Sequence, residues 1–108
     1  MAQKYTDFLK AIANEDRMMM LIMLSQYQEG LTPSQMGQQF FLEYATINHH
    51  LHELSNAEVL TISQKGRQSV YKLNQEKLRS LINELFWVCL QIENPQKEAP
   101  RYVFELTD

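Results

Sequence analysis

Cysteine is almost missing from this chain, because Cys89 is the only one among its 108 residues. A single thiol cannot form a disulfide within the chain, and it cannot build a cluster of thiolate metal ligands. Glycine is also scarce, and the chain contains no glycine-rich phosphate loop, no nucleophile beside a base and no obvious pair of carboxylates. We therefore expect no enzyme activity and no cofactor.

Long hydrophobic runs are missing as well. The longest strongly apolar run extends from Met18 to Leu24, whereas a membrane helix needs roughly 20 apolar residues. The N-terminus contains no signal-like apolar core. These absences predict a cytoplasmic protein with no membrane partner. Because low-complexity tracts and internal repeats are also lacking, we expect one domain over residues 1–92 and a tail over residues 93–108.

Positive charge is in short supply, since the formal net charge is −3 and the pI is about 5.6. As a whole-chain value this argues against binding to nucleic acid. The distribution is more informative, because the segment from Tyr44 to Lys72 contains three positive and two negative residues, whereas the segments on either side have no positive excess. Such a small excess predicts that binding to DNA phosphates relies on two subunits acting together.

Three successive patterns between Thr32 and Leu73 predict two helices and a hairpin. Thr32 and Gln35 have the spacing of a capping box, with proline at the first helical position between them. A second helix follows from Ala45 to Leu54, where apolar and polar residues separate onto opposite faces. Two alternating runs, over residues 61–64 and 68–73, flank a basic tip and predict a β-hairpin. The expected fold class is mainly α with a small β-hairpin (α+β).

Two further helices are predicted at the start of the chain. Apolar spacing that begins at Tyr5 and Phe8 predicts a short amphipathic helix. Asn14 is placed to cap the next helix, which we expect to continue to about Gln28, with Gly30 as its terminator. This second helix is rich in methionine, and core packing is favoured over a monovalent copper site because consecutive helical positions point in different directions. The methionines concerned are Met18, Met19, Met20 and Met23.

Three segments resemble the ArsR/SmtB-like family of winged-helix repressors, over about Phe8 to Leu90. The segment from Ala11 to Arg17 is similar to the family's opening pattern LADPTRLRIL, with Asn-Glu-Asp-Arg in place of Asp-Pro-Thr-Arg. The segment from Thr46 to Leu54 is similar to the recognition-helix pattern TVSRHLKVL. The most specific match lies in residues 66–73, Gly-Arg-Gln-Ser-Val-Tyr-Lys-Leu, which resemble the family's wing pattern GRxVYYxL.

The resemblance implies a homodimeric winged helix-turn-helix that binds double-stranded DNA and regulates transcription, acting as a repressor on a palindromic operator. In the major groove, Asn48 can both donate and accept at an adenine edge, Ala45 can contact a thymine methyl group, and His49 can donate to guanine or phosphate. The expected contacts of the recognition helix are Tyr44, Ala45, Thr46, Asn48, His49 and His52. Those of the wing are Lys65, Gly66 and Arg67.

The last predicted helix, from Gln75 to Gln91, has an apolar stripe too broad for one small domain to cover. Together with the first helix it predicts the homodimer interface, which the resemblance also implies. We expect this helix to end before Pro95. The expected interface residues are Tyr5, Phe8, Leu81, Leu85, Val88 and Cys89.

Many relatives in that family sense metal ions, but this chain departs from both of their ligand patterns. Residues 32–39 contain no cysteine, and residues 78–92 contain no histidine. We therefore expect no metal-sensing role. A metal site at the neighbouring His49, His50 and His52 is disfavoured, because Glu53 is the only further ligand nearby. Protonation of these histidines would instead strengthen DNA binding as the pH falls.

Two questions stay open at this stage. The tail is too apolar for a plain linker, so it could dock as a strand, cover the dimer, occupy a ligand groove for an unknown effector or bind a protein partner. Its apolar residues are Tyr102, Val103, Phe104 and Leu106. The alternative function for the whole chain is a winged-helix protein-interaction module that has lost DNA binding.

Overall fold

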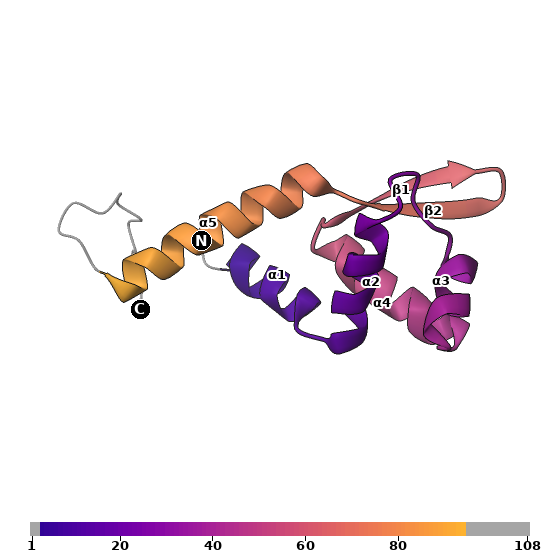
Figure 1. Ribbon diagram of the computed structural model, residues 1–108, viewed down its shortest axis with the longest axis horizontal. Coiled ribbons are helices and arrows are strands. Elements are labelled where there is room, and N and C mark those ends of the chain that lie inside the picture. Colours follow the sequence, from indigo (N-terminus) through magenta and orange to yellow (C-terminus); the bar gives the residue numbers. More distant parts are fainter. Residues whose placement is uncertain (1–2, 95–108) are drawn as a thin grey trace.

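The computed structural model describes residues 3–94. Within them the chain forms five helices and one antiparallel hairpin (Figure 1). Their order is α1 (Gln3–Ile12), α2 (Glu15–Ser25), α3 (Pro33–Phe40), α4 (Tyr44–Asn56), β1 (Leu60–Lys65), β2 (Gln68–Leu73) and α5 (Gln75–Glu93). The predicted α+β class is confirmed. The part of the predicted tail over residues 95–108 lies outside the described residues.

Side chains cap α2 and α3 as their sequences predict. Asn14 Oδ1 accepts a hydrogen bond from the backbone N–H of Arg17 at 3.0 Å. The Thr32 hydroxyl accepts from the N–H of Gln35 at 3.2 Å, and Gln35 Oε1 accepts from the N–H of Thr32 at 2.9 Å. These bonds satisfy N–H groups that lack a partner inside the helix. The capping box therefore determines where α3 begins.

The end of α2 differs from the prediction. The helix stops at Ser25 rather than near Gln28, and Gln26 closes it by donating its N–H to the carbonyl of Met23 at 3.0 Å. The apolar spacing gave no signal for this end, because the run of helix-forming residues continues past it. Gly30 lies in the following loop and is not the helix terminator.

The loop that contains Gly30 lies against β2. A Cβ atom on Gly30 would be 2.7 Å from three atoms of β2, among them the carbonyl oxygen of Tyr71, and the φ angle of Gly30 is +85°. The next residue, Leu31, donates to and accepts from the backbone of Tyr71, at 3.0 and 2.9 Å. Glycine is thus required both by the backbone angle and by the close approach.

The hydrophobic core lies between the first four helices, the base of the hairpin and Leu81 of α5. Its most completely buried side chains are Met20, Met36, Ile47, Leu51, Leu54 and Val59. The prediction that the methionines of α2 pack in the core is therefore right for Met20 and for Met23, which is half-buried against the core. It is wrong for Met18 and Met19, which lie on exposed faces of the helix because neighbouring helical positions point in different directions.

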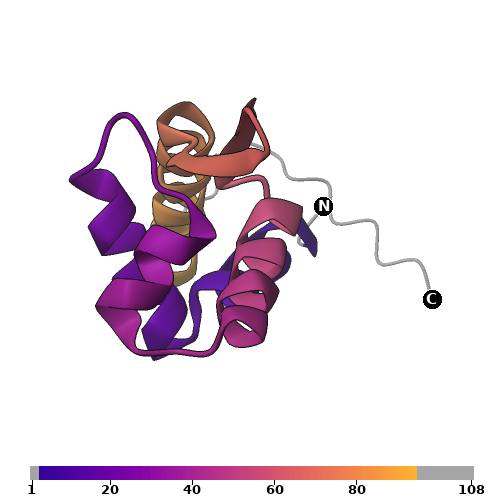
Figure 2. The same cartoon turned by 90° about the vertical axis from the view of Figure 1, so that its right-hand side faces the viewer.

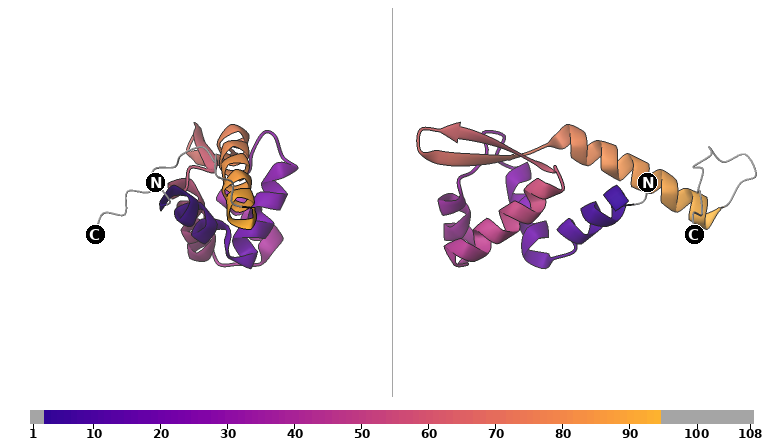
Figure 3. Two further views of the ribbon diagram at one scale, coloured as in Figure 1. Left: turned by 90° about the vertical axis from the view of Figure 1, so that its left-hand side faces the viewer. Right: turned by 180° about the vertical axis from the view of Figure 1, so that it is seen from behind.

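Helix α5 projects away from the rest of the molecule along its longest dimension, with α1 beside it (Figure 1, Figure 3). The molecule measures 53 × 28 × 22 Å. Lys4 Nζ in α1 lies 3.0 Å from Glu84 Oε2 in α5. Among residues 3–94 we find no helix that is both long enough and apolar enough to cross a membrane.

Candidate nucleic-acid interface

Helix α4 has the two faces that its sequence predicts. Ile47, Leu51 and Leu54 are fully buried against the core. On the opposite side Tyr44, Ala45, His49 and His52 are exposed, and Thr46 and Asn48 are half-buried at its edges. Short polar groups are therefore presented along the outer surface of a helix that the core holds firmly. An α-helix with such a surface has the width to enter the major groove of B-DNA.

The hairpin ends in an exposed basic tip. Lys65 pairs with Gln68 at the last position of the antiparallel register, and Gly66 and Arg67 form the turn between them. Gly66 has a φ angle of +67°, and no atom lies within 4 Å of the position that a Cβ would occupy. Glycine is therefore favoured here by the backbone conformation of the turn and not by close packing. Among residues 3–94 neither Lys65 nor Arg67 forms an ion pair. Both cations are free to meet phosphates.

A cleft of about 220 Å³ joins the hairpin to the two helices. Figure 2 views the molecule from this end and shows α3, α4 and the hairpin side by side. The cleft is lined by the first turn of α3, by Tyr44 and Asn48 of α4, by Arg67 of the hairpin turn and by residues of β2. Three of the expected contact residues therefore meet at one polar depression. The cleft also contains Ser34, Gln68 and Ser69, which sequence reasoning missed.

A second feature that sequence reasoning missed lies at the turn between α3 and α4. Phe41 has a left-handed backbone with φ of 54°, and its side chain is 93% exposed. Its N–H donates to the carbonyl of Gly37 at 3.1 Å, which closes α3. No sequence signal marked this position, because left-handed helix caps usually contain glycine.

The comparisons with known proteins point to one architecture. No protein-family model and no curated protein matches the chain. Among solved structures, an ArsR-like transcriptional regulator from a Rhodococcus species gives a TM-score of 0.74 at 16% identity, over 84% of each chain. A homodimeric winged helix-turn-helix DNA-binding domain from Mycobacterium bovis gives 0.66 at 16% identity, over 87% of this chain and 86% of that one. HlyU from Vibrio cholerae gives 0.64 at 23% identity, over 81% of this chain and 92% of that one. The fold is a winged helix-turn-helix.

In this winged helix, α3 and α4 form the helix-turn-helix, with α4 in the place of the recognition helix, and the β1–β2 hairpin forms the wing. The predicted resemblance to ArsR-family winged helices is thus confirmed at the level of the fold. That the individual residues of α4 and the wing contact DNA stays a prediction.

The three histidines of the recognition helix occupy different environments. His49 and His52 are exposed, and His52 Nε2 lies 3.2 Å from Asn56 Nδ2. His50 is buried, with 6% of its surface exposed. Burial lowers the pKa of His50 below its ordinary value near 6.5, and the neighbouring Arg17 guanidinium and His49 lower it further, whereas Asp16 raises it. His50 is therefore neutral at neutral pH.

The residues expected at a dimer interface fall into two groups. Phe8 and Leu81 are buried inside a single protomer, with 2% and 3% of their surfaces exposed. Tyr5, Leu85 and Val88 are half-buried, and Cys89 is exposed. Phe8 and Leu81 thus belong to the core of the winged helix, and the other four remain accessible to a partner.

An apolar groove of about 440 Å³ runs between α1, α2 and α5. Met18 and Ile22 of α2 and Ile82 and Phe86 of α5 line it and are partly exposed. Phe86 is the extreme case, because 62% of its surface is accessible to solvent in the protomer. Exposure of so many large apolar side chains in one place is typical of an interaction surface.

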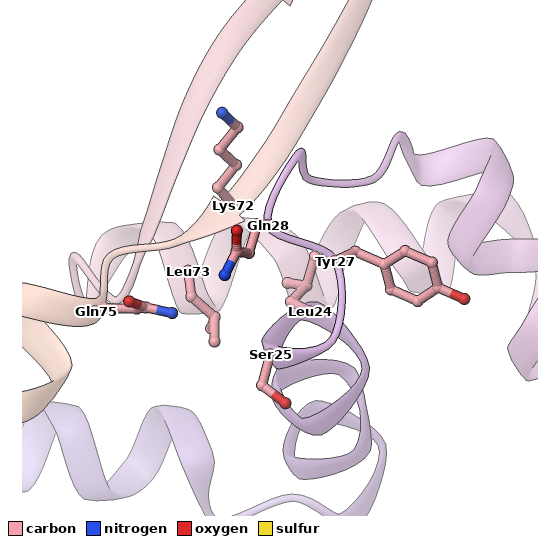
Figure 4. A pocket seen from close by; sticks show the side chains of 7 residues that line it. All are labelled: Leu24, Ser25, Tyr27, Gln28, Lys72, Leu73 and Gln75. Atoms are coloured by element: carbon pink, nitrogen blue, oxygen red, sulfur yellow. The ribbon is translucent and has the colours of Figure 1, made fainter.

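A further pocket of about 260 Å³ lies where α2, the wing and α5 meet (Figure 4). Leu24 and Leu73 are its apolar members. Figure 4 shows that the polar ends of Tyr27 and Lys72 point in different directions, away from these leucines. Since its one charged side chain, that of Lys72, points away from it, this pocket is not a candidate site for a charged ligand.

Proposed function

We propose that this protein is a sequence-specific DNA-binding transcriptional regulator, which acts as a homodimeric repressor on a palindromic operator. The observation that supports this function best is the cleft in which the first turn of α3, the outer face of α4 and the basic wing meet. A DNA backbone held there would place α4 in the adjacent major groove. The proposal includes the expected cytoplasmic location, because such a regulator must have access to chromosomal DNA.

In this proposal the recognition helix reads bases and the wing holds the backbone. Asn48 has an amide that can donate and accept at one adenine edge, and Ala45 is exposed beside it for contact with a thymine methyl group. Arg67 and Lys65 contact phosphates, while Gly66 allows the wing to approach the minor groove closely. Thr46 and His52 lie at the sides of the helix, where phosphates flank the groove.

The homodimer is proposed from the apolar surface of α5 and α1. The two-fold axis would bring the α5 helices of two protomers together and bury the exposed ring of Phe86. The Mycobacterium bovis domain with the same fold is described as homodimeric. Two recognition helices related by such an axis would meet the two halves of an inverted repeat.

A selection from random duplex DNA tests the function directly. Purified protein is incubated with random fragments, the bound fragments are sequenced, and the best fragment is titrated at several salt concentrations. We expect an enriched inverted repeat whose affinity falls steeply with salt. Lack of enrichment at low salt would contradict the proposal and favour the alternative, a protein-interaction module that has lost DNA binding.

The substitution Arg67→Ala tests the role of the wing. We expect the slope of log affinity against log salt to decrease by about one per subunit, because one phosphate contact is lost and sequence preference is unaffected. Arg79→Ala provides the matched control, since Arg79 is also exposed but lies in α5. A salt slope that Arg67→Ala leaves unchanged would remove the wing from the interface.

The substitution Asn48→Ala tests base reading by the recognition helix. We expect binding to weaken by about 1–3 kcal/mol and the preference at one base pair of each half-site to relax. Asn83→Ala is the control, because Asn83 is also an asparagine but is exposed on α5, away from the recognition helix and the wing. Equal losses on operator and random DNA would show that Asn48 contacts the backbone instead.

A further inference from the structure

The side chain of Arg17 connects three helices. Arg17 lies in the first turn of α2, and its Nε donates to the carbonyl of Ala11, near the end of α1, at 2.5 Å. Its Nη2 donates to the carbonyl of Lys10 at 3.4 Å. Its Nη1 lies 3.3 Å from Nδ1 of His50 in α4. One guanidinium therefore joins the final turn of α1 to the buried side of the recognition helix.

The chemistry of arginine determines the state of His50. A guanidinium has only N–H donors and stays charged, so Nδ1 of His50 must accept the hydrogen bond and cannot itself hold a proton. The proton of the neutral ring then resides on Nε2, which lies 3.8 Å from Oδ2 of Asp16. The neutral Nε2–H form of His50 is the one form that allows the contact with Arg17.

The position of this contact matters for DNA reading. His50 lies on the buried face of α4, and Asn48 and His49 precede it directly on the surface proposed to face DNA. The same guanidinium also binds backbone carbonyls of α1. Helix α1 lies against α5 and lines the apolar groove. The Arg17 side chain therefore links α1, which is proposed to take part in the dimer, to α4, which is proposed to read the bases.

We propose that Arg17 and His50 are positioning residues for DNA recognition, and that they hold the recognition helix at a set orientation to α1 only while His50 is neutral. This inference rests on the proposed function. Protonation of His50 would place an N–H on Nδ1 directly against the Arg17 guanidinium and break the contact. Acid would then release α4 from α1 and weaken binding to the operator, without any change at the DNA surface.

Among residues 3–94 the charged groups that act on His50 come from α2 and α4, and α1 contributes the backbone carbonyls that bind Arg17. Arg17 and His49 oppose protonation, and Asp16 favours it. Because the pKa of His50 is lowered, the DNA-binding form is present at neutral pH and is lost as the pH falls through that lowered value. The exposed His49 and His52 act in the opposite direction, because their protonation attracts phosphate.

A pH titration of operator affinity separates these two effects. We expect the affinity of the unchanged protein to fall in acid relative to that of His50→Asn, by at most about tenfold per pH unit for each protomer. In His50→Asn the amide oxygen can accept from Arg17 at every pH, so the fall should vanish and the attraction from His49 and His52 should remain. His52→Gln is the control and should retain the fall. Persistence of the acid loss in His50→Asn would overturn the inference.

Substitution of the arginine provides a second test. Arg17→Met should weaken operator binding by about tenfold or more at neutral pH, the effect expected when a hydrogen bond to a charged group is lost. Sedimentation should still show a dimer, and the pH dependence due to His50 should disappear. Arg17→Met with unchanged affinity and pH profile would contradict the proposal.

Nitrogen NMR of the His50 ring requires neither substitution nor DNA. We expect a protonated Nε2 and an unprotonated Nδ1 at neutral pH, which is the form that the Arg17 contact demands. The opposite tautomer, or a ring that is charged at neutral pH, would overturn the inference even if the protein binds an operator. If NMR shows the expected tautomer but the selection experiment enriches no DNA sequence, the proposed function is contradicted instead.

Discussion

The two ends of this molecule differ in how well their apolar side chains are shielded from water. At the helix-turn-helix and wing, the apolar side of α4 is fully buried and the outer surface is mostly polar. At the other end, α5 extends from the body and exposes Ile82, Phe86 and Leu90. The first end has a closed core beneath α4, and its outer surface is polar apart from Phe41, Tyr44 and Ile62, whereas the second end lacks a covering for its apolar side chains. The difference separates the part whose core closes within one protomer from the part that the proposed homodimer would cover.

The largest expected effect comes from a charge placed on the uncovered end. Phe86→Asp should leave the protomer folded, because the ring is already mostly exposed, but it should abolish the dimer. Loss of the second binding site should lower operator affinity by about 10²–10⁴-fold. Sedimentation and DNA titration measure the two effects. Ser80→Asp adds the same charge at another exposed position of α5 and should leave both unchanged. If the Phe86→Asp variant still sediments as a dimer, another surface must hold the protomers together.

A smaller effect is expected when the closed core is opened. Leu51→Ala removes a fully buried side chain beneath the recognition helix and should lower the free energy of unfolding by about 2–5 kcal/mol. Urea unfolding followed by circular dichroism measures this loss. Ile62→Ala in β1 is the comparison, because Ile62 is half exposed and its loss should change stability by no more than about 0.5 kcal/mol. Equal losses at the two positions would mean that the core is not closed where α4 lies.

The smallest effect concerns the start of α3. Thr32→Ala removes half of the capping box and should cost about 0.5–2 kcal/mol of stability. Ser34→Ala, two residues later, should not change the free energy of unfolding, because the capping bonds of α3 are made by Thr32 and Gln35. Thermal unfolding of the two variants distinguishes a cap from a neutral surface position. Identical midpoints for Thr32→Ala and the unchanged protein would show that the box adds no stability.

Local signals were enough to predict much of the helix-turn-helix and the wing. The capping box at Thr32, the two faces of α4 and the hairpin around Gly66 each depend on neighbouring residues, so the sequence alone specifies them. The fold class followed from their order along the chain. The left-handed backbone of Phe41 was missed, because its residue type gives no indication of that conformation.

Tertiary contacts explain what the sequence left undetermined. An apolar stripe shows that side chains need covering but does not show which neighbour covers them. Phe8 and Leu81 are covered within the protomer, while Met18 and Met19 are exposed although their residue type suggested the core. Ser34, Ser69 and Gln68 entered the candidate site only because α3 and β2 meet in space. The partner of His50 likewise comes from a helix 33 positions earlier in the chain.

The paired backbone hydrogen bonds between Leu31 and Tyr71 have a consequence for how this architecture can change over generations. They connect the residue just before α3 to the wing through main-chain atoms, and Gly30 permits the close approach. The spacing between the helix-turn-helix and the wing is therefore independent of which side chains occupy α4 or the hairpin tip. If the protein binds DNA as proposed, substitutions at those surface positions would alter the preferred bases while the length of DNA covered by each protomer stays the same.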